Sequence, residues 1–527
     1  MEKRLSNRKM IKKWVVVPAT LMVATSILAA CTGGAQSTAE KHVLRIGVLY
    51  GGADNEPYFR SQYTDTYEMM NPEVDFEIVS AIDYSDMRFQ TPDENGNIDQ
   101  PDPYAKMKEM LTGDNPVDVV VLDYSMLRRL VQDNLLKQLD PLISQSKFDL
   151  TDYVPTVIDG IKSAGDNNIY ALTPTFSSSA LFYNKKLFEE NGVEPPTDNM
   201  TWKDVMDKAR LMSKGEGADR KYGMTFSRWN GGDFNSDVQT YSSALQLKMW
   251  DDKGEKMLVN TPQWETVWNT IAGLYREDIV PDQDDINKIN EESNKASEDG
   301  NYVYNPTQGD LFASGKVAMT IADYYYVNEL NSTMNNASKI KGFEAFDWDV
   351  VTYPTHEEAP GIGGNISFSQ LMGINNNAQN PEDAWKFIQF TNSKEWAEMK
   401  SRSTYELVAR KEFLKPKNGM NYNIDAFTSL KPIPPQSVDT EQLFRDKPGI
   451  WEAQNASYEL FQKVIKGDIT SKEALAEWET KGNSILEKLK KQPAKTDSSN
   501  AADGGSTDDA STQVEEEETT ATEVPAG

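Results

Sequence analysis

The first third of the chain alternates strand and helix signals, and this alternation constrains the fold more than any other feature. Apolar residues recur at every second position in two segments, and a third segment is apolar at nearly every position. The strand segments are 44–50, 74–78 and 117–122, and the helical segments are 57–70, 103–111 and 125–134. A strand that is apolar throughout is typical of a parallel strand covered on both faces. The order therefore predicts an α/β fold built on an open sheet flanked by helices.

The residues at the ends of these strands are the first candidates for a binding site. In an open α/β sheet, ligands bind beyond the carboxyl ends of the strands. Tyr50 stands at the end of the first strand, and Asp123 and Tyr124 follow the third. We therefore expect these three residues to line a ligand site.

Length, charge and cysteine content limit the number of domains and the class of function. The core between about residues 41 and 492 is longer than one hydrophobic core usually grows, which predicts two lobes. The formal net charge of −28 repels phosphate backbones and argues against nucleic-acid binding. With one Cys and two His, the chain cannot form an internal disulfide or a His-rich metal site, and we expect no cofactor.

The N-terminus has the layout of a secretory signal. Basic residues within 3–13 precede an apolar run at 14–28, and small residues then lead to Cys31. A cysteine at this place resembles a bacterial lipobox, so we expect Cys31 to be lipidated after removal of residues 1–30. The alternatives are an ordinary signal peptide with a stray cysteine and an uncleaved anchor. Pro18 interrupts the apolar run, which is shorter than the ~20 residues of a spanning helix.

Three polar segments flank or interrupt the core. We expect residues 31–41 to form a flexible tether, and residues 493–527 a disordered acidic tail, because neither can bury much apolar surface. The Asp and Asn spacing at 93–102 faintly resembles a calcium loop. Its glycine and glutamate do not stand where an EF-hand needs them, so turns are favoured and no metal is assigned.

Five segments, in this order, resemble the extracellular solute-binding proteins of ABC sugar importers, the maltose-binding-like family. They are DVVVLD with NLLKQLDPL (118–142), IYALTP with LFYNKKLF (169–188), EPP with TWKD (194–204), FASGKVAMT (312–320) and DAWKFI (383–388). Together they span nearly the whole core. Because they lie in register behind a lipobox, the chain is identified by this resemblance as a member of the family.

The resemblance implies a two-lobed fold of the type II periplasmic-binding-protein class, with the ligand cleft at the hinge. Mapped onto this chain, the connections between the lobes fall near 172–175, 361–368 and 416–423. Lobe 1 would comprise 42–172 with 366–415, and lobe 2 would comprise 174–362 with 420–490. The Pro and Gly residues near these connections suit segments that absorb backbone rotation when the lobes close.

The resemblance also implies a function without catalysis. The protein would be the membrane-anchored, extracytoplasmic substrate-binding component of an ABC importer. It would capture a carbohydrate, such as an oligosaccharide, by lobe closure and deliver it to the transmembrane subunits of a permease. It would act as a monomer, held at the outer face of the cell membrane by the lipid on Cys31.

A sugar presents an apolar ring face and many hydroxyls, so its site needs aromatic side chains for stacking and short polar side chains. Family register and the strand-end rule together nominate two sets of residues. The aromatic set is Tyr50, Tyr124, Phe176, Trp229, Tyr324 and Trp451, and the polar set is Asp123, Ser177, Ser178, Asn230, Asp233, Asp323 and Asn365.

For several of these residues a structural role competes with the ligand role. Trp229, between a strand and a glycine-rich loop, either carries the ligand or packs between the lobes. Asp123 either accepts a hydroxyl or caps the helix that begins at residue 125. Tyr324 is one of three consecutive tyrosines, of which one or two can face the cleft, and core packing is the favoured role of Trp451. Arg228 keeps acidic sugars possible as ligands.

Three other functions are compatible with the sequence. An extracellular carbohydrate-active enzyme needs two carboxylates ~5–10 Å apart, and no local motif nominates such a pair. A binding protein of the same fold for peptides or another solute is the second alternative. A surface adhesin or a sensor accessory is the third.

Overall fold

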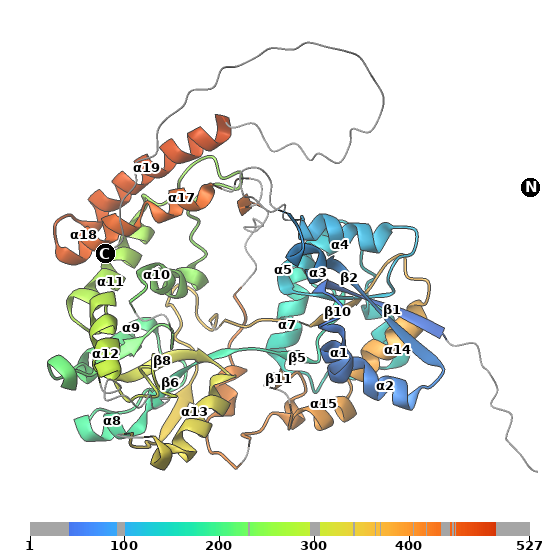
Figure 1. Ribbon diagram of the computed structural model, residues 1–527, viewed down its shortest axis with the longest axis horizontal. Helices are drawn as coiled ribbons and strands as arrows, with labels where there is room; N and C mark the ends of the chain where they lie inside the picture. Colours follow the sequence, from blue (N-terminus) through green and yellow to red (C-terminus); the bar gives the residue numbers. More distant parts are fainter. Residues whose placement is uncertain are drawn as a thin grey trace, which may run out of the picture.

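We analysed a computed structural model of the chain. It describes residues 42–491, except for 92–100, 230–231, 296–305, 341–342, 364, 369, 404, 418, 434–442, 445–446 and 448. Two mixed sheets, each covered by helices, form two lobes (Figure 1). The predicted α/β class is therefore confirmed. Residues 1–41 with Cys31, most of the 93–102 insertion and the tail at 493–527 lie outside the described residues.

The first lobe is built on a five-stranded sheet of order β2-β1-β3-β10-β4. Its strands are β1 (His42–Gly51), β2 (Val74–Asp83), β3 (Val119–Leu122), β4 (Ala171–Leu172) and β10 (Leu371–Ile374). β1 pairs in parallel with β2 and β3, whereas β10 runs antiparallel to β3 and β4. Every residue of β3 is buried, as expected for a parallel strand covered on both faces.

Helices cover both faces of this first sheet. They are α1 (Glu56–Phe59), α2 (Asp65–Met70), α3 (Tyr84–Arg88), α4 (Pro103–Thr112), α5 (Tyr124–Gln132), α6 (Asp140–Ser146), α7 (Pro155–Ala164), α14 (Pro381–Thr391) and α15 (Lys394–Lys400), with the π-helix η1 (Arg60–Thr64). The buried Asp118 carboxylate ties the sheet to α14, because it accepts hydrogen bonds from the backbone N–H of Arg45 (3.1 Å) and of Asn380 (2.7 Å).

The second lobe is built on a four-stranded sheet of order β7-β8-β6-β9. Its strands are β6 (Ser179–Asn184), β7 (Tyr222–Thr225), β8 (Val317–Asp323) and β9 (Trp348–Val351). Its α-helices are α8 (Lys185–Asn191), α9 (Trp202–Met212), α10 (Phe234–Ser242), α11 (Pro262–Arg276), α12 (Gln283–Lys295), α13 (Tyr326–Asn335), α17 (Ile450–Asn455), α18 (Tyr458–Lys466) and α19 (Ser471–Lys491). β7 and β8 are parallel, whereas β6 runs antiparallel to β8 and β9.

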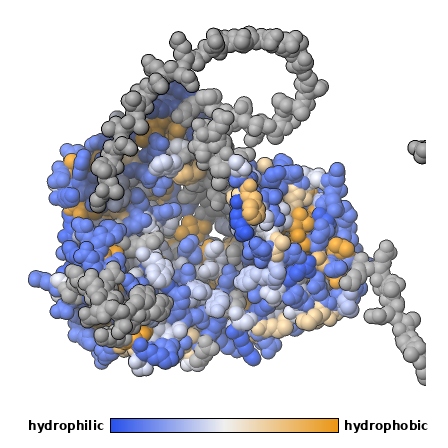
Figure 2. All heavy atoms as spheres, viewed as in Figure 1, coloured by the Kyte–Doolittle hydropathy of each residue, from blue (hydrophilic) through white to orange (hydrophobic). Residues whose placement is uncertain are grey.

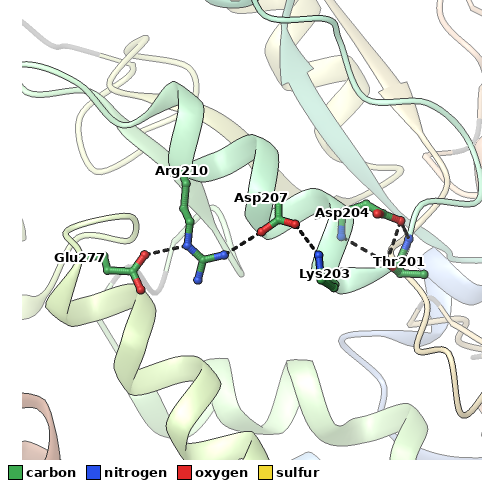
Figure 3. Close-up of polar contacts among 6 residues, drawn as sticks. All are labelled: Thr201, Lys203, Asp204, Asp207, Arg210 and Glu277. Carbon is green, nitrogen blue, oxygen red and sulfur yellow. Dashed lines mark hydrogen bonds and ion pairs between the residues drawn. The ribbon is translucent and has the colours of Figure 1, made fainter.

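Helix α9 shows how local sequence determines a helix boundary in this lobe. The Thr201 hydroxyl accepts from the backbone N–H of Asp204 (3.2 Å), whose carboxylate accepts from the backbone N–H of Thr201 (3.0 Å) (Figure 3). This reciprocal capping box satisfies two amide donors that the first helical turn leaves free. Further along, Arg210 bonds Asp207 on the same helix and Glu277 at the end of α11 (2.7 Å), which links the two helices (Figure 3).

The lobes are joined by short segments that pair with one another. β5 (Thr175–Phe176) lies between β4 and β6 and pairs antiparallel with β11 (Leu407–Val408). Beside it, Ser177 and Ser367 exchange two backbone hydrogen bonds of 3.0 and 2.9 Å, so the segment entering lobe 2 runs next to the one returning to lobe 1. The exact lobe boundaries given above stay a prediction.

Two negative findings hold for the described part of the chain. None of its helices is both long and apolar enough to cross a membrane. Within the same described residues, no group of three or more His, Cys, Asp or Glu side chains is arranged to hold a metal ion.

Lobe 2 contains a fully buried carboxyl. Asp237 in α10 is 3% exposed and accepts a hydrogen bond of 2.7 Å from the Tyr275 hydroxyl in α11. Burial raises the pKa of Asp237 to about 8, from an ordinary value of 3.8. In the folded protein the carboxyl therefore stays protonated at pH values where the unfolded chain has already lost the proton.

We predict that Asp237 makes the protein less stable as the pH rises. Between pH 4 and pH 8 the unfolded chain releases this proton and the folded chain keeps it, so the free energy of unfolding falls by up to roughly 1.4 kcal/mol per pH unit. Asp237→Asn cannot ionise and still accepts from Tyr275. Chemical denaturation should therefore show the variant gaining stability relative to the wild type from pH 5 to pH 8.

Asp207→Asn is the control for this experiment. A hydrogen bond from Lys203 lowers the pKa of Asp207, so its carboxyl is ionised in both states at pH 5 and above. The stability difference between this variant and the wild type should then be the same at pH 5 and pH 8. A difference for Asp237→Asn that also stays constant would contradict the assignment of a buried, protonated carboxyl.

Candidate functional site

The candidate site lies where the two lobes face each other. Figure 1 shows α3 and α5, which follow β2 and β3, on the side of lobe 1 that faces lobe 2. The space-filling view is hollowed between the two lobes (Figure 2). The carboxyl ends of the parallel strands of lobe 1 thus lie at the hollow, which is where an open α/β sheet binds its ligand.

On lobe 1 this surface carries a stacked pair of tyrosines. Tyr50 is 44% exposed near the end of β1, and its ring stacks on that of Tyr84 with 5.9 Å between centroids and 12° between planes. Tyr84 directly follows β2, whose last residue pairs with Gly51. Sequence reasoning named Tyr50 and missed Tyr84. The sequence pattern ended this strand at residue 78, whereas β2 runs to Asp83, so the strand-end rule pointed too early in the chain.

Asp123 and Tyr124 each make contacts that account for their positions. The Asp123 carboxylate caps α5 by accepting from the backbone N–H of Met126 and the hydroxyl of Ser125, both at 2.8 Å, and the residue remains exposed. The Tyr124 hydroxyl donates to the carbonyl of Gly160 (2.8 Å), and its ring packs edge-on against Phe368. Partial burial raises the pKa of Tyr124. The cap of α5 is thus observed, and a ligand role for either residue stays a prediction.

At the hinge, the expectation for Phe176 is wrong. Its side chain is completely buried in the central apolar cluster, because β5 pairs with β11 and turns this residue inward. It therefore offers no surface to a ligand. Ser178 is also buried, whereas Ser177 is partly exposed and Asn365 is exposed on the neighbouring segment.

On lobe 2 the exposed aromatic residue is Trp229. It lies in the loop after β7, is 56% exposed, and rests on the Arg228 guanidinium, whose Cζ is 4.2 Å from the ring centroid. Asn230 lies outside the described residues. Asp233 caps α10, and Asp323 is exposed at the end of β8.

Among the three consecutive tyrosines, the expectation for Tyr324 is wrong. Tyr324 is 2% exposed, its hydroxyl is 3.2 Å from that of Tyr422, and burial raises its pKa strongly. Tyr325 is the exposed member and packs against the exposed Tyr405, with 5.3 Å between ring centroids. Both residues lie in the turn between β8 and α13, where residue 324 is buried and residue 325 is exposed.

Trp451 and Arg228 are the remaining candidates for contact with a ligand. Trp451 is about half exposed in α17, so it does not pack in a core, and its ligand role stays a prediction. The Arg228 side chain is only 11% exposed and forms ion pairs with Asp310 (3.7 Å) and Glu329. It is therefore not the free cation that an acidic ligand would need.

Two cavities among the described residues lie away from these rings or at the hinge. One of about 330 Å³ is lined by residues such as Arg220, Tyr222 and Lys316, at the N-terminal ends of β7 and β8. The other, about 10 Å³, lies beside Tyr324 and Lys417 at the hinge. Because β7 and β8 are parallel, their N-terminal ends are opposite to Trp229 and Asp323.

The sequence profile described as "Bacterial extracellular solute-binding protein" matches residues 95–398. A curated relative named as a binding protein of Brucella abortus is 24% identical over 436 residues, which cover 80% of this chain and 88% of the relative. A binding protein of Brucella suis is equally similar.

Solved structures show the same two-lobed fold. An extracellular solute-binding protein, family 1, of Alicyclobacillus acidocaldarius has a TM-score of 0.58 and 15% identity, covering 85% of this chain and all of its own. A sugar transporter of Rhizobium etli in an open conformation has a TM-score of 0.55 and 17% identity, covering 84% of this chain and 99% of its own. A cyclo/maltodextrin-binding protein complexed with maltotetraose has a TM-score of 0.52 and 17% identity, covering 87% of this chain and all of its own.

The family profile matches more than half of the chain, and the fold agrees with it. Its members bind solutes, so this protein is a binding protein and not an enzyme. The chain therefore belongs to the family of bacterial extracellular solute-binding proteins.

Proposed function

We propose that this protein is the substrate-binding component of an ABC importer and that its substrate is an oligosaccharide. The observation that supports the sugar most directly is the set of exposed aromatic rings at strand ends and at the hinge. The set is Tyr50, Tyr84, Trp229 and Tyr325. Exposed rings of this kind stack on the apolar face of a sugar ring.

Polar groups at strand ends and at the hinge suit the hydroxyls of a sugar. The exposed carboxylates of Asp123 and Asp323 can each accept hydrogen bonds from hydroxyls, and Ser177 and Asn365 can donate as well as accept. The similar solved structures include a sugar transporter and a protein complexed with maltotetraose. Sugar binding by these proteins is consistent with the exposed aromatic rings of this chain.

Capture would proceed by closure of the lobes around the ligand. A sugar that contacts Tyr50 and Tyr84 on lobe 1 and Trp229 on lobe 2 stabilises the closed state and has fewer contacts in the open one. Ligand binding shifts the equilibrium only by this difference in affinity. The paired segments at Ser177 and Ser367 leave few backbone torsions to change during closure.

Delivery would take place at the outer face of the cell membrane. Lipid on Cys31 would hold the receptor near its permease. Residues 31–41 would form a flexible tether that lets the lobes contact the permease. A single acyl chain binds a membrane only marginally, so the anchor is expected to carry more than one chain. The permease would then recognise the closed, ligand-bound form of the monomer.

A ligand screen tests the proposed substrate class. We expect some of a panel of neutral oligosaccharides of glucose, galactose, mannose and xylose to raise the melting temperature, because ligand binds only the folded state. Oligopeptides of similar size should leave it unchanged. Stabilisation by peptides alone would show that the ligand is a peptide and not a sugar. Appearance of hydrolysis products would show that the protein is a carbohydrate-active enzyme.

We predict that Trp229→Ala weakens binding of the sugar selected in the screen by about 10- to 100-fold, because it removes a stacking surface at the ligand. Isothermal titration calorimetry measures the change. Leu211→Ala is the matched control, because Leu211 is a similarly exposed apolar residue on α9 and should leave the affinity unchanged. Equal losses for both variants would argue against Trp229 as a binding residue.

We predict that Cys31→Ser releases the protein from the membrane. Serine cannot form the thioether to the lipid, so the variant should not incorporate an alkyne-labelled fatty acid and should leave the membrane fraction of expressing cells. The wild-type chain should incorporate the label and sediment with membranes. An unlabelled Cys31→Ser protein that stays with the membrane would favour an uncleaved anchor, and a labelled one would contradict Cys31 as the lipidated residue.

A further inference from the structure

The Arg228 guanidinium lies between two aromatic rings. Its Cζ is 4.2 Å from the ring centroid of Trp229 and 4.1 Å from that of Tyr326. Tyr326 is 1% exposed and packs against the core residues Phe182 and Phe312. The exposed indole is thus connected to the core of lobe 2 through a cation that it covers.

Two carboxylates form ion pairs with this cation, although its Nε has no hydrogen bond. Asp310 approaches the Arg228 Nε with 3.7 Å between nitrogen and oxygen, and Glu329 pairs with Nη2. The Tyr326 hydroxyl donates to the same Asp310 carboxylate at 3.0 Å, so ring, cation and carboxylate form one network. Next to it, a Cβ added to Gly309 would lie 3.8 Å from Trp229, so the indole edge meets bare backbone there.

Stability alone does not explain this arrangement. Buried ion pairs can often be replaced by apolar residues of similar size with little loss of stability, because desolvation offsets the attraction between the charges. Arg228 can instead fix the orientation of the ring, because a planar guanidinium stacks on an aromatic ring and keeps its hydrogen bonds in the same plane. Trp229 lies in a loop, and its side chain is 56% exposed.

We propose that Arg228 is a positioning residue that fixes the Trp229 indole as a stacking surface, and that the ligand at this surface is an uncharged sugar. The inference rests on the proposed function. Arg228 is nearly buried and paired with two acids, so the cation nearest to this surface is not available to a ligand carboxylate. The exposed Asp233 and Asp323 on the same lobe would repel an acidic sugar.

The first test needs no ligand. The chain has 11 tryptophans, and Trp229→Phe identifies the Trp229 signal in the ¹⁹F NMR spectrum of protein labelled with 5-fluorotryptophan. We expect a single sharp line in the wild type and a shifted, broadened line in Arg228→Met. Arg210→Met, which removes another ion-paired arginine, should leave the line unchanged. An unchanged line in Arg228→Met would overturn the positioning role.

The second test measures binding of the best neutral tetrasaccharide from the screen and of tetragalacturonate. We expect Arg228→Met to weaken binding of the neutral sugar about 2- to 10-fold, because the unfixed indole must be ordered on binding. Arg228→Lys should lose less, and tetragalacturonate should bind the wild type at least tenfold more weakly. Tighter binding of tetragalacturonate would overturn the uncharged ligand.

The two tests separate this inference from the proposed function. If no sugar binds the wild type, the proposed function fails, while the ¹⁹F spectrum still decides whether Arg228 fixes Trp229. Thermal melting shows whether each variant is folded. Should Arg228→Met not fold, Glu329→Gln removes one partner of Arg228 at a partly exposed position, and it is expected to broaden the Trp229 line to a smaller extent.

Discussion

The paired backbone of the connecting segments is the constraint on which the rest of the structure depends. Ser177 and Ser367 bond each other through their main chains, and β5 bonds β11 beside them. Because the segments lie together, the proposed closure of the two lobes would take place about a single axis. Each lobe keeps its own sheet, so the lobes can close without repacking either sheet.

The facing surfaces combine exposed rings with carboxylates, and this combination decides what kind of ligand they suit. Tyr50 with Tyr84 on one lobe and Trp229 on the other supply apolar faces. The exposed acids can accept hydrogen bonds, while Arg228, which contacts Trp229, is paired internally with Asp310 and Glu329. Recognition would thus depend on stacking and hydrogen bonds more than on net charge.

Sequence reasoning succeeded where a local pattern has one structural meaning. The apolar run at β3 predicted a strand buried on both faces, and every residue of that strand is buried. Tyr50 is exposed near the end of β1, and its ligand role stays a prediction. Sequence reasoning failed where burial depends on a distant partner. Phe176 is buried by pairing with β11, more than 200 residues further along the chain, and Tyr324 faces Tyr422. No local pattern contains those partners.

By itself, the sequence determined the class of fold and the strand ends at the candidate site, because periodicity and short motifs depend only on neighbouring residues. It also predicts an N-terminal leader. Only the tertiary structure decided which rings are exposed. It places Tyr84 on Tyr50, turns Tyr325 outward and neutralises Arg228 with two acids from elsewhere in the chain. The reason is physical: exposure and charge balance are properties of contacts between segments, and folding alone creates those contacts.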